Sequence, residues 1–506
     1  PPPPPPPSVQ AEDGIRDDIS CLVGSEMCIR DSACPAGIDV PNYVAAIACG
    51  NYKQAVDIIR ERNPFPAVCG RICIHPCETK CRRGELDEAI AIRTLKRFAS
   101  DWYFENIGMA EKPFPVSKSQ KIAVVGAGPA GLTCAYFLSQ MGYKAHVFES
   151  QQVAGGMLGI AVPEFRLPRE VIEEEVNYIE SCGIDIHYNA PIDASHTVNQ
   201  LLREGFSAVF IAAGAQASKQ IGIPGEELNL DGVYYGLPFL TDIRCGEKIP
   251  LAGKAVVIGG GNVAFDTART ALRVGAQDVH IYYRRGVDEM PAWKKDIEEA
   301  VEEGVIIKPF WSPRRILHDN AKVTGIEFVG SRTIFEQDGT SYVKEDPEQL
   351  LKVDADAVLI AVGQAPDVSF ISKESQLERS LWGSLEVDKN SLTTNVAGIF
   401  AGGDFITGPT TVISAIASGR RAAIAIDHYL SGIKGPVQIV DEKTQFFETA
   451  GLALESESTE EMPRIQIKVE NPTLRSRDFR EVEKGFTEEQ ARIEAARCLR
   501  CDLEER

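Results

Sequence analysis

The chain has 506 residues, of which 44% are hydrophobic and 25% are charged, a composition typical of a globular protein of roughly three domains at about 150 residues each. The net charge of −20 disfavours binding to nucleic acid or anionic lipid, because such a field repels phosphate groups. The sequence has no apolar run approaching the roughly 18 residues of a membrane span, and it has no visible secretion signal. We therefore expect a cytoplasmic protein without a membrane span.

The N-terminal segment, residues 1–32, begins with seven prolines and continues without helical or strand periodicity, which predicts disorder. Its stretches SVQAEDGIRD and CLVGSEMCIRDS resemble the translated read-through of a sequencing adapter. We expect this segment to be foreign to the fold, with native sequence beginning near Ser32 or Ala33. Cys28 would then take no part in the chemistry of the protein.

Residues 33–117 are expected to form a helical domain. Apolar residues recur at helical spacing in VPNYVAAIACGNYKQAVDIIRERN, where Gly50-Asn51 divides the pattern, and another helix is expected over AIRTLKRFASDWYFEN. Thirteen cysteines are present in the chain, and four of them recur at every fourth residue in this domain. Cys49, beside the helix-breaking glycine, is expected to be packed. The candidate metal ligands of the domain are Cys34, Cys69, Cys73, Cys77 and Cys81.

Clustered cysteines in a chain without a secretion signal favour metal binding over disulfides. Cys34 is followed by a proline, and Pro76 interrupts the helix that would otherwise align the cysteine run. Short cysteine runs with a Cys-Pro are typical of iron–sulfur clusters. A structural zinc site is the alternative, although its usual spacing is CxxC followed by a second CxxC. A separate CxxC, Cys498 and Cys501, closes a predicted helix in the tail that opens with a capping pattern at Thr487.

A first dinucleotide-binding pattern follows the helical domain, in KIAVVGAGPAGLTCAYFLSQMGYKAHVFE. The glycines lie between an apolar strand and a helix, so that backbone can approach a pyrophosphate at the helix N-terminus. Glu149 ends the next strand and can accept hydrogen bonds from ribose hydroxyls, which favours a nucleotide without a 2′-phosphate. The expected binding residues of this turn are Gly126, Gly128, Pro129, Ala130 and Gly131.

The same pattern recurs in KAVVIGGGNVAFDTARTALRVGAQDVHIYYRR. Arg284 and Arg285 stand where the first site has its glutamate, and arginine suits a 2′-phosphate, so NADP(H) is expected and NAD(H) is possible. Arginines on a solvated strand end are the alternative interpretation. Two such units predict a doubly wound α/β architecture. The expected binding residues of this turn are Gly259, Gly261, Asn262, Val263 and Ala264.

The stretch TTNVAGIFAGGDFITGPTTVISAIASGRRAA resembles the C-terminal flavin motif of the two-dinucleotide-domain flavoprotein superfamily. AVFIAAG (208–214) and AVLIAVG (357–363) resemble its crossover strands, and GGMLGIAVPEFRLP resembles its flavin-side loop. The resemblance implies FAD at the first site, with Asp404 on the ribityl chain. It also suggests Glu164 and Arg166 as catalytic candidates that position the nicotinamide. The cofactor-binding residues that it adds are Gly155, Gly156, Arg166, Gly363, Gly403, Asp404, Thr411 and Val412.

The stretch NPFPAVCGRICIHPCETKCRRGELDEAIAIRTLKRFASDW resembles the iron–sulfur region of the glutamate synthase small-subunit family. The same module occurs in dihydropyrimidine dehydrogenase and in the large subunit of NADH-dependent reduced ferredoxin:NADP oxidoreductase. The similarity spans residues 33 to about 430 and implies FAD, NAD(P)H and two [4Fe–4S] clusters. One cluster would use Cys34, Cys73 and Cys77, with Cys69 as its fourth ligand.

The second cluster would use Cys81 and three other ligands. The family places a CxxC upstream and a cysteine four residues before the Cys-Pro, where this chain has Arg30. We hypothesise that the tail folds back, so that Cys498 and Cys501 complete this cluster. Alternatively, the tail pair belongs to a partner interface or begins a ferredoxin-like extension.

The expected fold class is α/β, with two Rossmann-like domains of the two-dinucleotide-binding flavoprotein type preceded by the helical iron–sulfur domain. The boundaries are 118–248 with 366–432 for FAD, 249–365 for NAD(P)H, and 433–506 for the tail. Cys134, Cys182 and Cys245 stand alone and are expected to be buried, which disfavours a disulfide beside the flavin.

The expected function is electron transfer between NAD(P)H and iron–sulfur clusters through FAD, with a partner subunit or a ferredoxin as acceptor or donor in a hetero-oligomer. A glutamate synthase small subunit serving a large subunit is the closest alternative. A non-catalytic subunit that holds clusters is an alternative of another class, and a disulfide reductase that uses Cys498 and Cys501 is a third.

Overall fold

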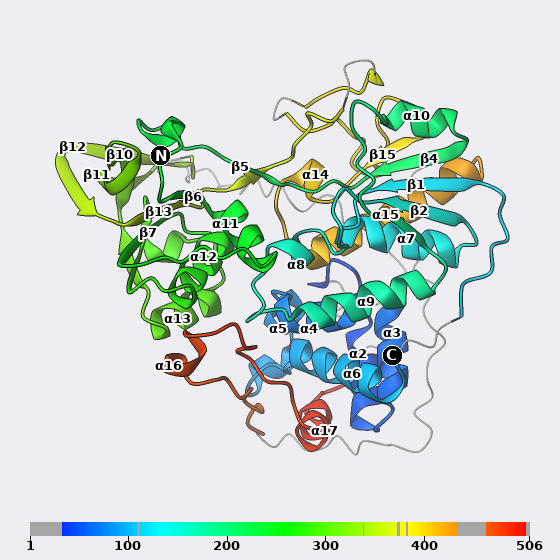
Figure 1. Ribbon diagram of the computed structural model, residues 1–506. Coiled ribbons are helices and arrows are strands. Elements are labelled where there is room, and N and C mark those ends of the chain that lie inside the picture. The colour runs from blue at the N-terminus through cyan, green and yellow to red at the C-terminus, as the bar shows by residue number, and fades with distance from the viewer. Residues whose placement is uncertain are drawn as a thin grey trace, which may run out of the picture.

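The computed structural model describes residues 33–108, 112–336, 338–371, 375–380, 383–433 and 462–501 (Figure 1). The segment 1–32, with the expectations placed on it and on Cys28, lies outside these residues. None of the helices described is long and apolar enough to cross a membrane.

The helical domain begins with two antiparallel helices separated by Gly50, whose φ of +79° only glycine adopts freely. Prolines open two of the helices that carry the cysteine run, a position where the missing N–H costs nothing. Its elements are α2 (Val40–Ala48), α3 (Tyr52–Arg60), α4 (Pro66–Ile72), α5 (Pro76–Thr79), η1 (Arg82–Glu85) and α6 (Ile92–Asn106).

The first α/β domain has a five-stranded parallel sheet in the order β15-β4-β1-β2-β3. Its last strand in the chain, β15, comes after the second sheet in sequence, so two distant segments build one domain. Helices α7 and α15 pack against each other beside this sheet. Its strands are β1 (Lys121–Val125), β2 (Lys144–Phe148), β3 (Asp185–His187), β4 (Phe206–Ile211) and β15 (Ile399–Ala401), and its helices are α7 (Pro129–Gln140), α8 (Met157–Ile160), α9 (Arg169–Ser181), α10 (Val198–Arg203), α14 (Asp404–Thr407) and α15 (Val412–Leu430).

The second α/β domain has a parallel sheet in the order β6-β13-β7-β8-β9. An antiparallel sheet, β10-β11-β12, extends from it, and this extension was not predicted from the sequence. The short strands β5 (Ala217–Ser218) and β14 (Gln364–Ala365) pair where the chain crosses between the domains. The remaining elements are η2 (Glu226–Leu228), β6 (Val233–Tyr235), α11 (Gly236–Arg244), β7 (Lys254–Ile258), α12 (Asn262–Arg273), β8 (Asp278–Tyr283), η3 (Val287–Glu289), α13 (Lys294–Glu302), β9 (Ile306–Pro309), β10 (Trp311–Asp319), β11 (Lys322–Phe335), β12 (Ser341–Asp354) and β13 (Ala357–Ile360).

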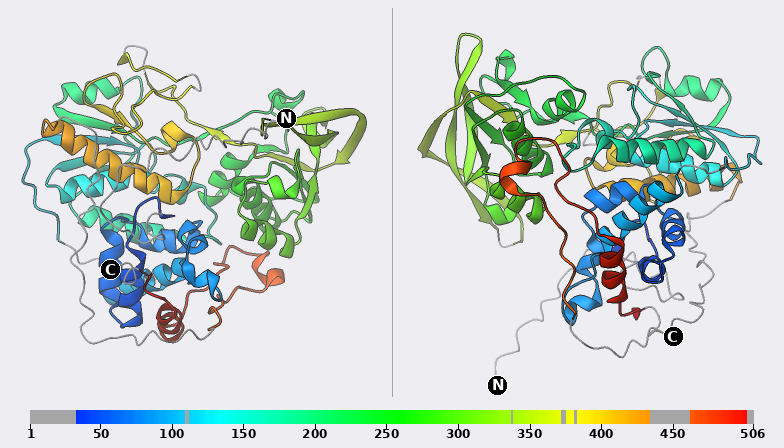
Figure 2. Two further views of the ribbon diagram at one scale, coloured as in Figure 1. Left: turned by 180° about the vertical axis from the view of Figure 1, so that it is seen from behind. Right: turned by 60° about the horizontal axis from the view of Figure 1, so that its bottom comes forward.

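The tail, residues 462–501, begins against the helical domain, where Arg464 pairs with Glu78, reaches the second α/β domain at Arg475, which pairs with Glu303, and then returns to the helical domain (Figure 2). It contains α16 (Pro472–Arg475) and α17 (Glu488–Ala496), and α17 packs against α2 and α6. The predicted cap at Thr487 is confirmed, because its side chain accepts a hydrogen bond from Gln490 N and the Gln490 side chain accepts one from Thr487 N.

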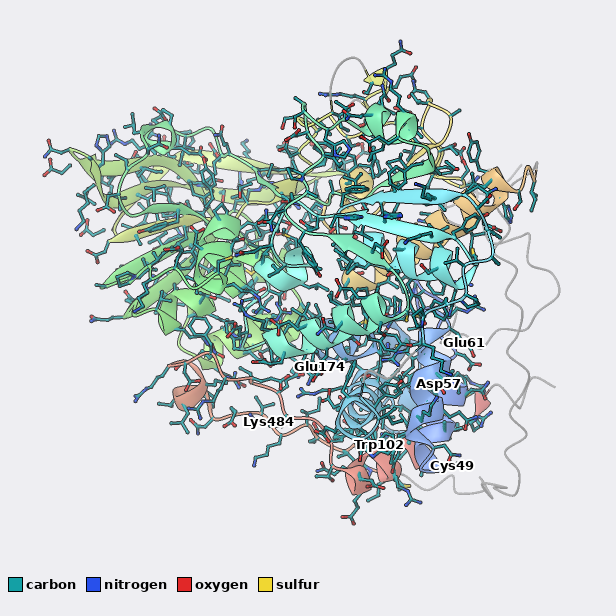
Figure 3. All side chains as sticks on the ribbon, turned by 45° about the vertical axis from the view of Figure 1, so that its right-hand side comes forward. Cys49, Asp57, Glu61, Trp102, Glu174 and Lys484 are labelled. Carbon is teal, nitrogen blue, oxygen red and sulfur yellow. The ribbon has the colours of Figure 1, made fainter. Side chains whose placement is uncertain are left out.

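The cysteines outside the candidate ligand set are placed differently from one another. Cys134 and Cys182 are buried, as expected. Cys245 is exposed, so the expectation that it is buried is wrong: it caps the end of α11 and begins a run of exposed residues. Cys49 is half-buried at the end of α2, on the side away from the first α/β domain (Figure 3).

Candidate active site

The first glycine turn brings two stretches of backbone together without side chains between them. Gly126 has φ of +100°, and a Cβ there would lie 2.6 Å from the Ala212 carbonyl oxygen. A Cβ on Gly156 would lie 2.9 Å from the Gly128 Cα. Because α7 begins at Pro129, its N-terminus opens onto this turn and offers N–H groups to an anion. The turn therefore fits a pyrophosphate.

Glu149 is buried at the end of β2 and holds the turn in shape. Its carboxylate accepts hydrogen bonds from Ala127 N at 2.7 Å and from Gln151 N at 2.8 Å. A carboxylate has about four lone-pair sites, so capacity is left for ribose hydroxyls.

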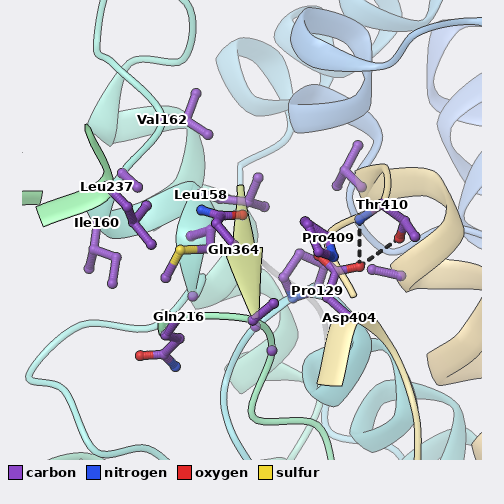
Figure 4. A pocket seen from close by; sticks show the side chains of 18 of the residues that line it. Pro129, Leu158, Ile160, Val162, Gln216, Leu237, Gln364, Asp404, Pro409 and Thr410 are labelled. Carbon is purple, nitrogen blue, oxygen red and sulfur yellow. Dashed lines mark hydrogen bonds between the residues drawn. The ribbon is translucent and has the colours of Figure 1, made fainter. Parts of the chain in front are cut away.

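A cavity of about 260 Å³ lies between the two α/β domains and the helical domain (Figure 4). Apolar side chains of Leu158, Ile160 and Leu237 gather on one side of it, and Asp404 lies on the other (Figure 4). Such a combination of a flat apolar wall and a few polar groups suits an aromatic ring system with a polar chain. The predicted site residues that line it are Gly126, Gly128, Pro129, Ala130, Glu149, Gly156, Arg166, Asn262, Val263, Asp404, Thr411 and Val412.

Asp404 is fixed by Thr410, whose backbone N and Oγ1 donate to Asp404 Oδ1 at 3.1 and 2.6 Å (Figure 4). Burial raises the pKa of Asp404 above its ordinary value. Thr411 caps the 19-residue helix α15, and its neighbour Val412 lines the cavity, so the positive end of a long helix faces this space.

The second glycine turn leaves space for phosphate groups in the same way. A Cβ on Gly259 would lie 2.2 Å from the Ala361 carbonyl oxygen, whereas a Cβ on Gly261 would meet nothing within 4 Å. Arg284 is exposed and Arg285 is half-buried, directly after β8. Arg285 Nε is buried without a hydrogen-bond partner among the described residues. Arginines that follow the second strand of such a unit suit a 2′-phosphate, so the position of this pair fits the predicted role.

The two catalytic candidates lie in different places. Arg166 lines the cavity, donates hydrogen bonds from Nη1 to both Asp266 oxygens at 2.8 Å and forms an ion pair with Asp296 at 3.0 Å, thereby linking the flavin-side loop to α12 and α13. Burial lowers the pKa of Arg166, but the two carboxylates raise it by more than burial lowers it. The pKa therefore lies above its ordinary value, and the side chain stays cationic. Glu164 is 40% exposed, pairs with Arg169 and lines a separate cavity.

Four of the predicted metal ligands lie around one buried lysine. Burial lowers the pKa of Lys96, but the Cys73, Cys69, Cys34 and Cys77 thiols beside it raise that pKa by their negative charge when ionised. Within the described ranges, no three His, Cys, Asp or Glu side chains converge closely enough for a single metal ion. The spacing of these cysteines along the chain, which lacks the paired CxxC usual for structural zinc, fits a cluster better than zinc. The four cysteines are Cys34, Cys69, Cys73 and Cys77, all buried.

The tail brings its CxxC back to the helical domain. Cys498 and Cys501 are both buried. Arg497, between α17 and Cys498, donates to Asp87 Oδ1 at 3.0 Å, and Arg83 Nη1 donates to the Arg497 carbonyl oxygen at 3.4 Å. Arg83 belongs to the turn that Cys81 opens, so the tail pair and the last cysteine of the run occupy the same region.

Several residues of this region were not singled out from the sequence. Asp266 lies one helical turn after Asn262, so helical spacing could have placed it beside the cavity. Ile72 and Ile74 also line the cavity. Their position on either side of the predicted ligand Cys73 is the sequence feature from which they could have been found. Glu175 of α9 accepts hydrogen bonds from Ala67 N and Val68 N at the start of α4. No local signal marks that contact.

Two dinucleotide turns, a cavity for an aromatic cofactor and a cysteine-rich helical domain define a pyridine nucleotide-dependent flavoprotein with iron–sulfur centres. Comparison with known families agrees. Residues 120–419 match the family described as pyridine nucleotide-disulphide oxidoreductase, and residues 8–107 match dihydropyrimidine dehydrogenase domain II, 4Fe-4S cluster. The chain belongs to the pyridine nucleotide-disulphide oxidoreductase family and carries an N-terminal 4Fe–4S domain. The second match begins inside the segment that we expected to be foreign.

The chain is similar over most of its length to subunits of NADP- or NADPH-dependent enzymes. It is 39% identical to the beta subunit of the NADP(+)-dependent formate dehydrogenase of Moorella thermoacetica, covering 92% of this chain and 69% of that one. It is 36% identical to the NADPH-Fe(3+) oxidoreductase subunit beta of Geobacter sulfurreducens, covering 92% and 74%. It is 32% identical to the small chain of Escherichia coli glutamate synthase [NADPH], covering 81% and 90%.

Among solved structures, FprA of Mycobacterium tuberculosis in complex with NADPH has the same fold, with a TM-score of 0.54 at 18% identity over 62% of this chain and 85% of that one. The predicted family, fold class and cofactor set are therefore confirmed. The protein is an oxidoreductase with sites for FAD and NAD(P)H and with a 4Fe–4S domain.

Proposed function

We propose that the protein passes electrons from NADPH, through FAD and then through two [4Fe–4S] clusters, to a partner subunit. The observation that carries this proposal is the position of Ile72 and Ile74, which flank Cys73 and line the cavity proposed for the flavin. The backbone that holds a cluster ligand is thus also part of the cavity wall. When bound, FAD accepts a hydride and releases electrons singly, which is the chemistry that joins a nicotinamide to one-electron centres.

Residues of this chain set the geometry around those groups. The glycines of the two turns let backbone approach each pyrophosphate, and Asp404 is held ready for the ribityl chain by Thr410. Arg166 fixes the nucleotide-binding domain against the flavin-side loop through Asp266 and Asp296, so it orients the nicotinamide indirectly. Its link to both domains makes it a better candidate for this role than Glu164. Ile72 and Ile74 lie between the cavity and Cys73.

For the first cluster we propose Cys34, Cys69, Cys73 and Cys77 as ligands. The buried cation of Lys96 offsets the negative charge of four thiolates. For the second cluster we propose Cys81, Cys498 and Cys501, with a fourth ligand from another residue, because all three cysteines are buried in one region.

Removing the tail ligands tests the second cluster. We expect Cys498→Ser and Cys501→Ser together to lower the iron content by about four atoms per chain. Reduction of the flavin by NADPH should continue, since the flavin cavity is untouched. Cys245→Ser, at an exposed cysteine outside both sets, is the control. Iron analysis and electron paramagnetic resonance of the reduced protein measure the result. Unchanged iron in the double variant would instead assign the tail pair to a partner interface or to thiol chemistry.

The partner is proposed from the relatives, which are named as subunits of a formate dehydrogenase, a ferric reductase and a glutamate synthase. A partner subunit or ferredoxin would accept electrons from the clusters, or donate them in the reverse direction. A glutamate synthase large subunit is a second candidate, supported by the 90% coverage of that small chain. Anaerobic purification with native partners identifies what co-elutes.

Arg285 gives the second site its preference for NADPH in this proposal. We expect Arg285→Ala to raise the Kd for NADP+ by about 10- to 100-fold, because a hydrogen bond to a charged group contributes about 1.5–3 kcal/mol. The Kd for NAD+ should change less than about twofold, since it has no 2′-phosphate. The control is Arg314→Ala, an arginine on β10 whose side chain is 52% exposed. Isothermal titration measures both ligands, and an equal loss for NADP+ and NAD+ would contradict the assignment.

A further inference from the structure

Phe310 has a backbone conformation that bulky residues avoid. It is the single residue between β9 and β10, and its φ is +66°. Residues other than glycine, asparagine and aspartate rarely adopt this left-handed region, because their Cβ clashes with the backbone. The side chain is 46% exposed, so burial of the ring in the core does not compensate the strain. An aromatic residue in this position needs another explanation.

Hydrogen bonds of its backbone connect Phe310 to Arg285 directly and to Arg284 through Ser331. The backbone N of Phe310 donates to the Arg285 carbonyl oxygen at 3.2 Å, and its carbonyl oxygen accepts from Ser331 N at 2.9 Å. Ser331 Oγ in turn donates to the Arg284 carbonyl oxygen at 2.8 Å. A Cβ on Gly286 would lie 3.3 Å from the tip of the Phe310 ring, so the ring lies beside this segment. A glycine at position 310 could make the same two backbone hydrogen bonds without strain.

The ring also lies at the edge of the sheet where a nucleotide binds. Strands β7, β8 and β9 are parallel neighbours, and Tyr283 is paired with Pro309 at their ends. Gly259, Arg284 and Phe310 therefore follow three adjacent strands at one edge. Nucleotides bind outside the carboxyl ends of such strands, with the pyrophosphate at the glycine turn and the ribose at the end of the next strand. The adenine would then reach the region of the third strand end.

We propose that the Phe310 ring is the surface on which the adenine of NAD(P)H stacks. This inference rests on the proposed nucleotide site at the second glycine turn. A half-exposed ring is accessible to a base, and aromatic rings stack on bases of any kind. Because NADPH and NADH share adenine, Phe310 strengthens the binding of both. Arg285 acts on the 2′-phosphate alone, so the two residues have separable effects.

The test compares Phe310→Gly and Phe310→Leu in the holoprotein with its FAD and clusters. For Phe310→Gly we expect the Kd values of NADP+ and NAD+ to rise by the same factor, between about 5- and 100-fold. Phe310→Leu should show a smaller rise, again equal for both. The Kd of nicotinamide mononucleotide, which lacks adenine, should not change. The midpoint of thermal unfolding of Phe310→Gly should stay the same or rise, because the strain is removed. Phe335→Ala, at a 72% exposed ring on β11, is the matched control.

Unchanged affinity of Phe310→Gly for both dinucleotides would overturn the inference. So would a loss confined to NADP+, since the ring would then act by holding Arg285 in place. If Arg285→Ala fails to change the preference between NADP+ and NAD+ while Phe310→Gly weakens both, the proposed NADPH preference is wrong and the stacking role stands. The two failures can thus be told apart.

Discussion

Replacing Cys73 by serine is expected to separate flavin reduction from every later electron transfer. Cys73 is buried, and its neighbours Ile72 and Ile74 line the flavin cavity, so the cluster that it holds is the one next to the flavin in our proposal. Losing this ligand should remove about four iron atoms per chain. The rate of electron transfer from NADPH to a one-electron acceptor should fall by more than about 100-fold. This is a larger fall than substitution of a residue that only contacts a metal ligand usually causes.

Flavin bleaching by NADPH in a stopped-flow instrument should keep its rate in Cys73→Ser, because the two nucleotide turns are unchanged. Cys49→Ser is the control, since Cys49 is half-buried at the far end of α2 and belongs to neither proposed ligand set. Rapid reduction of the acceptor by Cys73→Ser would mean that electrons leave the flavin by another route, and it would contradict the proposed order of centres.

The glycine turns, Glu149 and the helix cap at Thr487 could be predicted because neighbouring residues determine each of them. Gly126 must have positive φ where β1 turns into α7, and only glycine allows this cheaply. Thr487 and Gln490 satisfy each other across a single helical turn. Such features are written within a few residues of sequence, so pattern and spacing suffice.

The contacts between domains could not be predicted, because their two halves lie far apart in the chain. Arg166 meets Asp266 one hundred positions later, and Glu175 meets Ala67 from a different domain. The residues next to Asp266 and Glu175 in the sequence do not distinguish these two carboxylates from carboxylates on the surface. The prediction that Cys245 is buried was wrong for the same reason, since the burial of a side chain depends on whether other segments of the chain cover it.

The tail contacts all three domains, two of them through ion pairs, and no periodicity in its sequence marks these contacts. Glu481 pairs with Arg71 and Arg97 of the helical domain, and Val482 N donates to the Phe165 carbonyl oxygen of the flavin-side loop. Glu483 pairs with Arg93 and with Lys295 of α13. Lys484, next in this segment, lies between α6 and the second α/β domain (Figure 3). The proposed ligands Cys498 and Cys501 therefore belong to a segment that also holds the nucleotide-binding domain in place.

Glu303 is the residue on which that attachment most depends. Its side chain is fully buried, and its carboxylate accepts from Arg269 at 2.6 Å, from Arg273 at 2.7 Å and from Arg475 of the tail at 2.9 Å. Burial raises the pKa of Glu303, but hydrogen bonds from Arg269 and Arg273 lower it more strongly, to about 2. Glu303 thus contacts three buried guanidinium groups at once, of which Arg269 also pairs with Glu299 and Arg475 also pairs with Glu302.

Glu303→Gln should lower the free energy of unfolding at pH 7 by about 3–5 kcal/mol, because removing one partner leaves buried charge uncompensated. Urea denaturation followed by tryptophan fluorescence measures it. The folded-state pKa lies below the ordinary 4.5, so the stabilisation from Glu303 is complete above about pH 4.5 and is lost as the pH falls toward 2. The variant should therefore show a weaker loss of stability than the wild type over that acid range.

Glu302→Gln is the matched control, since Glu302 is the adjacent residue, is 55% exposed and pairs with Arg475 alone. We expect it to cost less than about 1 kcal/mol. If Glu303→Gln were no more destabilising than this control, the three arginines would have to be compensated by other carboxylates, of which Glu299 beside Arg269 is the nearest candidate. The tail would then be held by its contacts with the helical domain, and the second α/β domain could move without disturbing Cys498 and Cys501.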